Sequence, residues 1–267
     1  MVVSGLRFFS FSFEFSFSLK ISIITVAFNS AQTIADTVRS VKAQVGVEVE
    51  HIIVDGASKD DTLAVVRSVN AQARIISEPD NGIYDAMNKG IRLATGEIIG
   101  ILNSDDYYTH DRVLAMVLER FQTTQCEGLY GDLVYVDSAD TSKVVRTWRA
   151  GLFEKEHFLN GWMPPHPTFF VERAIYETYG LYETALRSSA DYELMLRMLY
   201  RYEIDVQYIP DCLVCMRTGG QSNVSLRNRL KANREDRLAW KMNALTPRFY
   251  TTWLKPIRKI PQFIKKA

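Results

Sequence analysis

Two adjacent carboxylates, Asp105 and Asp106, follow an apolar segment over residues 97–103 that is typical of a buried strand. Acids this close to each other and to an apolar strand repel one another unless a cation or hydrogen-bond donors neutralise them. A hard divalent ion with oxygen ligands does this and also binds phosphates. The alternative is that one of the two acids caps a helix expected over residues 111–122. The pair by itself favours neither interpretation.

A second polar segment is an Asn-Gly turn that precedes a predicted helix over residues 83–94. Helix spacing places Tyr84 and Asn88 on one side of this helix and Asp85 and Lys89 on another. The acid and the lysine could simply form a surface ion pair of little energetic value. The N-terminus of the helix could also receive a phosphate, because the first backbone N–H groups of a helix have no partner within it.

The elements that must position these groups alternate between strands and helices. Four apolar, β-branched segments predict strands, over residues 20–28, 47–55, 73–77 and 97–103. The alternation predicts an α/β fold, with a Rossmann-like, mostly parallel sheet and helices on both of its faces. A polar cluster follows each strand, and ligands of such sheets bind beyond the carboxyl ends of the strands. Residues 20–125 are therefore expected to form a nucleotide-binding half, in which Asp55 could hydrogen-bond a nucleoside.

The second half of the domain, residues 126–225, has a less regular pattern and is expected to form a smaller, acceptor-side region. The chain ends in a basic segment, residues 226–267, which has 12 Lys or Arg and 2 acids although the formal net charge of the whole chain is +1. Phe249, Tyr250 and Trp253 are interleaved with these cations. Such a composition is typical of an amphipathic helix on an anionic membrane surface. The alternative is a solvated tail that packs loosely on the domain.

Composition indicates the compartment. A chain of 267 residues, 47% of them hydrophobic, is enough for one domain with a full core. It has no apolar run of transmembrane length. Three cysteines without a disulfide pattern indicate a reducing compartment. Residues 1–19 alternate apolar and polar side chains and are expected to be an extension without a functional role. We expect a cytoplasmic protein at the inner face of the cell membrane, with a membrane rather than a nucleic acid as its anionic partner.

The polar segments, taken in order, resemble the motifs of family 2 glycosyltransferases, which have the GT-A fold. Thr25-Val-Ala-Phe-Asn is similar to the family's T-V-x-Y-N motif, and Val54-Asp-Gly-Ala-Ser-Lys-Asp-Asp-Thr to its V-D-D-G-S-x-D-x-T. Gly82-Ile-Tyr-Asp-Ala-Met-Asn-Lys-Gly resembles the segment over the nucleotide. Asn103-Ser-Asp-Asp stands at the D-x-D motif, and Ala190-Asp-Tyr-Glu resembles the start of the catalytic helix. The resemblance covers residues 20–215 and is strongest over residues 20–110.

The resemblance implies a site for a nucleotide-sugar donor, a divalent cation (Mn²⁺ or Mg²⁺) and a saccharide or lipid-linked saccharide acceptor. The implied donor contacts are Thr25, Ala27, Asn29, Asp55, Asp80, Gly82, Tyr84, Asp85, Asn88, Lys89, Asn103 and Ser104. Asp105 and Asp106 would hold the metal. Inverting transfer needs a general base for the acceptor hydroxyl, and Asp191 is the candidate, with Glu193 as the second choice and a helix cap as the alternative role. His166 and Arg217 are candidate contacts to the acceptor or the diphosphate.

Two departures from the family pattern affect these assignments. Asn103 replaces the first acid of D-x-D, so Asp105 is expected to be the principal metal ligand with Asp106 in support. Gly56 replaces the second Asp of V-D-D-G, which leaves Asp55 as the acid that faces the base. The implied activity is hexosyl transfer in cell-surface polysaccharide biosynthesis. The alternatives are a nucleotidyltransferase, which usually carries a Gly-rich basic loop after the first strand, and a catalytically inactive nucleotide-sugar-binding protein.

Overall fold

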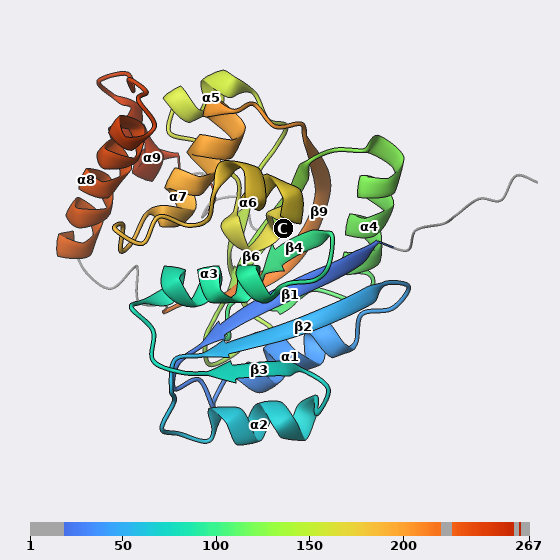
Figure 1. The fold of residues 1–267 in the computed structure, drawn as a ribbon. Coiled ribbons are helices and arrows are strands. Elements are labelled where there is room, and N and C mark those ends of the chain that lie inside the picture. Colours follow the sequence, from blue (N-terminus) through green and yellow to red (C-terminus); the bar gives the residue numbers. More distant parts are fainter. Residues whose placement is uncertain (1–18, 220–225, 259–261, 263–267) are drawn as a thin grey trace, which may run out of the picture.

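The structure is a computed structural model that describes residues 19–219, 226–258 and 262. Within these residues, one nine-stranded sheet has the order β3-β2-β1-β4-β8-β6-β9-β5, and β7 pairs with the C-terminal part of β6. Figure 1 shows β3, β2, β1 and β4 as neighbours at one side of this sheet. The strands are β1 (Lys20–Ala27), β2 (Glu48–Asp55), β3 (Arg74–Ser77), β4 (Ile98–Ile101), β5 (Tyr107–Tyr108), β6 (Gly128–Val136), β7 (Val144–Trp148), β8 (Phe170–Glu172) and β9 (Val206–Arg217).

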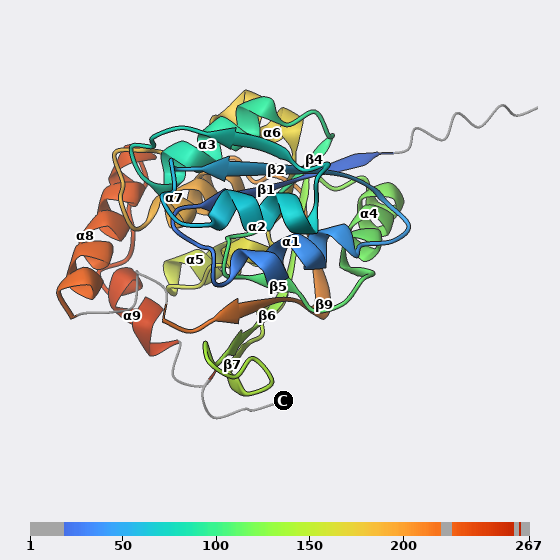
Figure 2. The same cartoon turned by 90° about the horizontal axis from the view of Figure 1, so that it is seen from below.

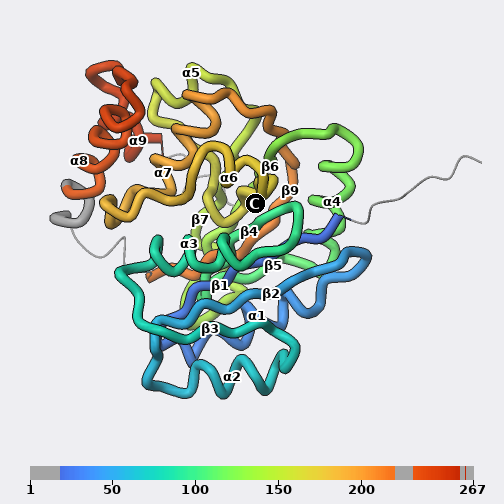
Figure 3. Tube along the Cα trace, in the orientation of Figure 1, coloured from blue at the N-terminus to red at the C-terminus, as the bar shows by residue number. Residues whose placement is uncertain are grey.

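Helices connect these strands and cover the sheet. They are α1 (Ile34–Lys42), α2 (Thr62–Val69), α3 (Ile83–Leu93), α4 (Val113–Thr124), α5 (Lys155–Leu159), α6 (Arg173–Tyr179), α7 (Ala190–Met195), α8 (Leu226–Met242) and α9 (Thr251–Ile257). A 3₁₀ turn, η1, spans His166–Thr168, and a π-helical segment, η2, spans Leu196–Arg201. The chain passes from the parallel strands of the first half to the mixed sheet and outer helices of the second (Figure 3).

The first half forms the expected parallel sheet. β1 pairs with β2 and β4, and β2 pairs with β3, all in parallel. The strands are buried on both faces, since Ile53 packs with α1 and α2 whereas Ile52 and Val54 pack with α3. Figure 2 shows α1 and α2 together on one side of β1 and β2. The α/β prediction, with a mostly parallel sheet and helices on both faces, is therefore confirmed.

The second half extends the same sheet with mixed pairing. β8 is antiparallel to β4 and β6, whereas β9 runs parallel to β6. The sheet thus joins both halves, and the large core between them includes side chains from α3 and from α7. The helix whose start the segment from Ala190 resembles is present, but only α7 is α-helical and the chain continues as η2. β5 has only two residues, which is too short for a strand pattern to be visible in the sequence.

The described part of the basic segment is attached to the domain. Trp240 of α8 is fully buried in the core, and its Nε1 donates a hydrogen bond of 2.8 Å to the hydroxyl of Tyr192. Phe249 and Trp253, by contrast, are 90% and 58% exposed. No helix among the described residues is long and apolar enough to span a membrane. The extension predicted over residues 1–19 lies outside the described residues except for Leu19, as does most of the chain after Arg258.

Candidate active site

The carboxyl ends of β1, β2 and β3 lie side by side. Parallel pairing sets Ala27 beside Asp55 and Asp55 beside Ser77. Asp55 is fully buried, and its carboxylate accepts hydrogen bonds from the backbone N–H of Ser58 (3.0 Å) and from the hydroxyls of Ser58 and Ser77 (2.7 Å for Ser77). We expected Asp55 to face a nucleoside base. The structure gives it a different task, because a buried carboxylate with three donors holds the turn after β2.

Asp80, another of the predicted donor contacts, approaches the turn after β2 at Gly56. A Cβ atom added to Gly56 would lie 2.9 Å from Oδ2 of Asp80 and 3.3 Å from the ring of Phe28. Asp80 is neutralised by Lys89, whose Nζ lies 2.7 Å from its Oδ1. The ring of Phe28 is 62% exposed. An exposed aromatic ring can stack on a nucleobase, and a half-buried carboxylate beside it can accept hydrogen bonds from the N–H groups of that base.

Lys89 forms ion pairs with acids of the turn that precedes its own helix. Besides Asp80, it contacts Glu78 at 2.9 Å, whereas Oδ2 of Asp85 is 3.7 Å away. Asp85 instead accepts a hydrogen bond of 3.0 Å from the backbone N–H of Asn81. Asp85 and Lys89, both predicted to contact the donor, therefore shape the turn before α3, and Lys89 also holds Asp80, whose side chain is 11% exposed.

The loop after β1 is held by several of the predicted donor contacts. Thr25 is buried and its hydroxyl lies 3.0 Å from Nε2 of His51. Asn29 has a left-handed backbone with φ of 49°, and its side chain accepts from the N–H of Lys59 at 2.9 Å. Gly82 has φ of 115°, a region that favours glycine, at the start of α3. These residues fix the backbone around the cleft.

The acidic loop after β4 is packed against α1. Asp106 is fully buried, and its backbone carbonyl accepts a hydrogen bond of 2.7 Å from the hydroxyl of Thr37. The hydroxyl of Ser104 donates to that of Ser30 at 2.8 Å. Burial and the nearby charge of Asp105 raise the pKa of Asp106 well above its usual range. Burial also raises the pKa of Asp105, although the charges of Arg217 and His166 oppose this shift.

The oxygen atoms of this loop fit a hard divalent cation. Oδ1 of Asn103 and Oδ1 of Asp106 are buried and accept no hydrogen bond from the described residues, and Asp105 remains half-buried. A set of two carboxylates and an amide offers oxygen donors only, as Mn²⁺ or Mg²⁺ prefers. In the part of the chain that is described, no cluster of three His, Cys, Asp or Glu side chains could hold a metal. Further ligands would therefore come from phosphate and water.

Asp191 lies where the two halves of the domain meet. The hydroxyl of Tyr84, from α3, donates to Oδ1 of Asp191 at 3.1 Å. Nδ1 of His166 lies 3.6 Å from the other carboxylate oxygen. The side chain of Asp191 is 21% exposed, so it can reach a ligand. The charge of His166 also acts on Asp105. Tyr84 of α3 and His166 thus both contact Asp191, and the charge of His166 also reaches the acidic loop.

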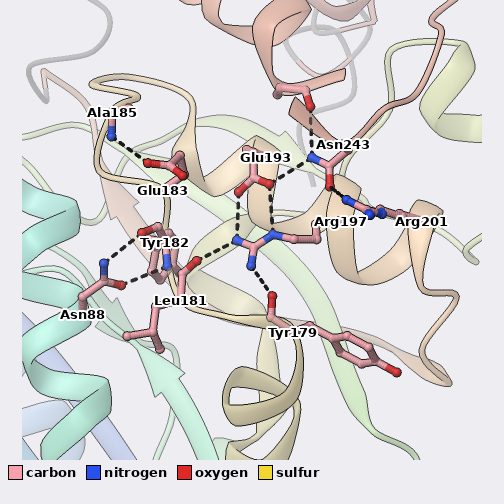
Figure 4. Close-up of polar contacts among 11 residues, drawn as sticks. Asn88, Tyr179, Leu181, Tyr182, Glu183, Ala185, Glu193, Arg197, Arg201 and Asn243 are labelled. Carbon is pink, nitrogen blue, oxygen red and sulfur yellow. Dashed lines mark hydrogen bonds and ion pairs between the residues drawn. The ribbon is translucent and has the colours of Figure 1, made fainter. Parts of the chain in front are cut away.

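Glu193 is not available as a second base. It is 3% exposed, and its carboxylate forms a two-pronged ion pair with Arg197, with both N–O distances at 2.9 Å. The side-chain amide of Asn243 donates to the same carboxylate at 2.9 Å (Figure 4). The carboxylate is therefore buried and already accepts three hydrogen bonds, so it is not open to a substrate. The sequence-based hypothesis of Glu193 as an alternative base is corrected by these contacts.

Asn88 also has a structural role. Its side chain donates to the backbone carbonyl of Tyr182 and accepts from the backbone N–H of the same residue, both at 2.9 Å (Figure 4). It is 3% exposed and therefore does not face the donor. The pairing ties α3 to the loop before α7, and the stacked rings of Tyr84 and Tyr182, 5.6 Å apart, reinforce it. Asn88 thus helps to set the position of Asp191.

Arg217 was expected in a loop that could close over a diphosphate. It instead ends β9 and is 8% exposed. Its guanidinium donates to the backbone carbonyl of Asp105 at 2.7 Å and forms an ion pair with Asp36 of α1. Asp36 and Thr37 were not predicted as site residues; both belong to the helix that follows the first strand-end cluster, where the side chain of Asp36 is 47% exposed and Thr37 lies on the buried face. Together with Arg217 they support the acidic loop from behind.

Comparison with known proteins identifies relatives of this chain. The family model described as "Glycosyl transferase family 2" matches residues 22–180. An uncharacterized glycosyltransferase of Mycobacterium tuberculosis is 32% identical over 180 residues, which are 66% of this chain and 68% of that protein. A PGL/p-HBAD biosynthesis glycosyltransferase of Mycobacterium bovis is 31% identical over 196 residues, 70% of this chain and 73% of the relative.

Solved structures share the fold. S. aureus TarS residues 1–349 in complex with UDP-GlcNAc superimposes with a TM-score of 0.65 at 16% identity, over 88% of this chain and 69% of that one. Against another TarS structure the match covers only 39% of the TarS chain. The mannosyltransferase PcManGT from Pyrobaculum calidifontis, in complex with GDP-Man and Mn²⁺, gives a TM-score of 0.62 at 17% identity, over 90% of this chain and 73% of PcManGT. The sheet and its helices thus have the GT-A arrangement.

Proposed function

The chain belongs to glycosyltransferase family 2, and we propose that it transfers a hexosyl residue from a nucleoside-diphosphate sugar to a saccharide hydroxyl, with inversion at the anomeric carbon. It is an enzyme of the hexosyltransferase type. The observation that carries the proposal is the position of Asp191, whose carboxylate contacts Tyr84 from the nucleotide half and lies beside His166. A general base at the junction of the two halves lies between donor and acceptor.

Each group has a chemical task in this scheme. Asp191 takes the proton of the acceptor hydroxyl while that oxygen bonds to the anomeric carbon and the nucleoside diphosphate leaves. Tyr84 and His166 orient the carboxylate. Asp105, with Asn103 and Asp106, would hold a divalent cation, which offsets the charge of the departing diphosphate. The GDP-Man and Mn²⁺ bound by PcManGT support both the donor class and the cation.

The nucleobase is proposed to lie on Phe28, with Asp80 accepting from its N–H groups. The exposure of Phe28 and the close approach of Asp80 to Gly56 support this position. The solved structures of similar fold bind UDP-GlcNAc in one case and GDP-Man in another. Either base has an N–H group that can donate a hydrogen bond to a carboxylate.

The cellular setting is proposed to be cell-surface polysaccharide biosynthesis at the cytoplasmic face of the membrane. Relatives named for PGL/p-HBAD biosynthesis and as chondroitin synthase support a saccharide acceptor. The exposed Phe249, which follows Arg248, and the exposed Trp253, whose ring centroid lies 5.7 Å from the guanidinium of Arg237, support peripheral binding to anionic lipid, since aromatic rings and cations together favour the interface. A lipid-linked acceptor would be presented at the same surface.

The test uses the purified full chain with a panel of nucleoside-diphosphate sugars. We expect release of nucleoside diphosphate that depends on Mn²⁺ or Mg²⁺ and stops with EDTA. Asp105→Ala should lower the rate by at least about 100-fold, in the range found when one transition-state-stabilising group is lost. Glu119→Ala, an exposed acid on α4, is the control. A protein that binds donors but never releases the diphosphate would be the inactive alternative, and a protein that binds none of them would contradict the proposal.

A further inference from the structure

A second cavity, of about 270 Å³, lies outside the donor site. It is bounded by the end of β7, by residues 161–163 and by α9 with the residue that follows it. Its wall includes Trp148, Trp162, Arg149, Lys255 and Arg258. Gln262 also lines it, and none of the described lining residues is acidic.

The cavity is built from rigid parts. Gly161 has φ of 74°, and a Cβ atom there would lie 2.5 Å from the backbone nitrogen of Lys255, so only glycine allows α9 to approach this closely. The hydroxyl of Thr251 donates to the carbonyl of Leu159 at 2.6 Å and holds α9 in place. Trp162 is fixed by a hydrogen bond of 2.8 Å from its Nε1 to the carbonyl of Ala150. The part of the wall formed by residues 161–163 and α9 is therefore fixed by the packing of the domain, whereas the side chains of Arg149 and Arg258 are exposed.

Two of the three cations form no ion pair with a described residue. Lys255 is neutralised by Asp236, with Nζ–O distances of 2.8 and 2.9 Å. Arg149 and Arg258 have no such partner among the described residues, and Arg258 contacts only the carbonyl of Asn160, at 3.4 Å. The charge of Arg149 also acts on Asp132, although burial raises the pKa of that acid overall. Arg149 and Arg258 both border the cavity and form no ion pair with a described residue, which favours an anionic ligand.

The cavity lies beside the proposed base. Met163, in its wall, precedes His166 by three residues, so their Cα atoms are at most about 10 Å apart. His166 in turn contacts Asp191. On the other side, Nζ of Lys255 lies 3.8 Å from the ring centroid of Tyr192, the residue after Asp191. Two separate connections thus place the cavity next to the acceptor side of the active site.

We propose that this cavity binds the anionic part of the acceptor: a sugar ring that carries a phosphate or a carboxylate. The proposal rests on the proposed function, because it names the substrate class of the same enzyme. The apolar face of a pyranose can pack against the half-buried ring of Trp148, since Trp162 is only 7% exposed, and the guanidinium groups of Arg149 and Arg258 match a phosphate or carboxylate. Affinity for the anion then brings a hydroxyl of the acceptor to Asp191.

The proposal is tested by measuring the affinity of the full chain for four ligands, by calorimetry or by tryptophan fluorescence. The ligands are glucose 1-phosphate, glucuronic acid, methyl glucoside and inorganic phosphate. We expect at least one of the two anionic sugars to bind at least tenfold more tightly than methyl glucoside and than inorganic phosphate. Preference for glucose 1-phosphate indicates a phosphate-linked acceptor, and preference for glucuronic acid indicates an acidic polymer. Equal binding of charged and neutral sugars overturns the proposal.

Variants locate the binding. The double variant Arg149→Gln/Arg258→Gln should weaken binding of the preferred anionic sugar at least tenfold and leave binding of UDP and GDP unchanged. Arg67→Gln/Arg112→Gln, which removes two exposed guanidinium groups elsewhere, is the matched control. Unchanged affinity in the first double variant overturns the proposal. Because donor binding and donor hydrolysis are measured separately on the same preparations, a failure here is distinguishable from a failure of the proposed glycosyltransferase reaction.

Discussion

Gly56 and Asp80 share a space that holds only one side chain. A Cβ atom on Gly56 would lie 2.9 Å from Oδ2 of Asp80, closer than such atoms approach without a shift. Gly56 is the position at which the V-D-D-G motif has its second acid. The carboxylate of Asp80 therefore stands next to the place where that acid would be. Asp80 in the following loop therefore compensates for the acid that is missing at Gly56.

This arrangement predicts a reciprocal exchange. Gly56→Asp should weaken binding of UDP or GDP at least tenfold, because the new side chain displaces Asp80. Asp80→Gly should do the same, because the carboxylate is lost. The double variant Gly56→Asp/Asp80→Gly should bind more tightly than either single variant. Calorimetric titration gives the coupling energy of the pair, which we expect to be about 1 kcal/mol or more. Additive losses in the double variant would contradict this interpretation.

The sequence predicted where the functional groups gather, because that follows from local pattern. The carboxyl ends of parallel strands share one edge, so the polar residues after β1, β2 and β4 had to be neighbours. The role of Asp55 was not predictable in this way. Its partner Ser77 is 22 residues further along the chain, and the burial that removes Asp55 from the cleft depends on β3.

The same limit applies to the second half. Glu193 and Asp191 are both acids in the first turn of one helix, and their spacing does not show which of them faces the cleft. The hydrogen bond from Asn243, 50 residues away, keeps the carboxylate of Glu193 in the core. Arg217 likewise forms an ion pair with Asp36, although the two residues are 181 positions apart in the sequence. Contacts between residues this distant depend on the complete fold, whereas strand and helix periodicity does not.

Substitution of the two acids should separate catalysis from stability. Asp191→Asn removes the proton acceptor and should lower kcat by at least about 100-fold with donor binding unchanged. Glu193→Gln breaks a buried ion pair with Arg197 and should lower the free energy of unfolding by about 3 kcal/mol. Turnover assays and urea unfolding on both variants make the comparison. A Glu193→Gln protein that is stable but inactive would reverse the assignment of the base.

The hydroxyl of Tyr84 is predicted to position the base without contacting the donor. Tyr84→Phe keeps the ring that stacks on Tyr182 but removes the hydrogen bond of 3.1 Å to Asp191. We expect kcat to fall about tenfold, with the KM for the donor and the unfolding free energy nearly unchanged, since one hydrogen bond to a charged group contributes about 1.5 kcal/mol. Steady-state kinetics at several donor concentrations separates kcat from KM. Tyr202→Phe, on a surface ring that is 39% exposed, is the control, and equal kinetics in the two variants would contradict the role of Tyr84.

His51 should make the fold sensitive to acid. It lies in β2 with 6% exposure, and burial away from water lowers its pKa from 6.5 to about 3. The unfolded chain therefore binds a proton between these two values whereas the folded chain does not, so stability is full above pH 6.5 and is lost as the pH falls toward 3. Between pH 7.5 and pH 5 this one group should cost about 2 kcal/mol.

His51→Gln removes the titrating group and keeps a polar side chain near Thr25. We expect this variant to be less stable than the wild type at pH 8 but to lose about 2 kcal/mol less on going to pH 5. Urea unfolding at pH 5, 6, 7 and 8 gives the two curves of unfolding free energy, and their difference cancels the contribution of every other group. His110→Gln, an exposed histidine, should retain the wild-type curve. Parallel curves for the wild type and His51→Gln would show that His51 is protonated in the folded protein as readily as in the unfolded chain.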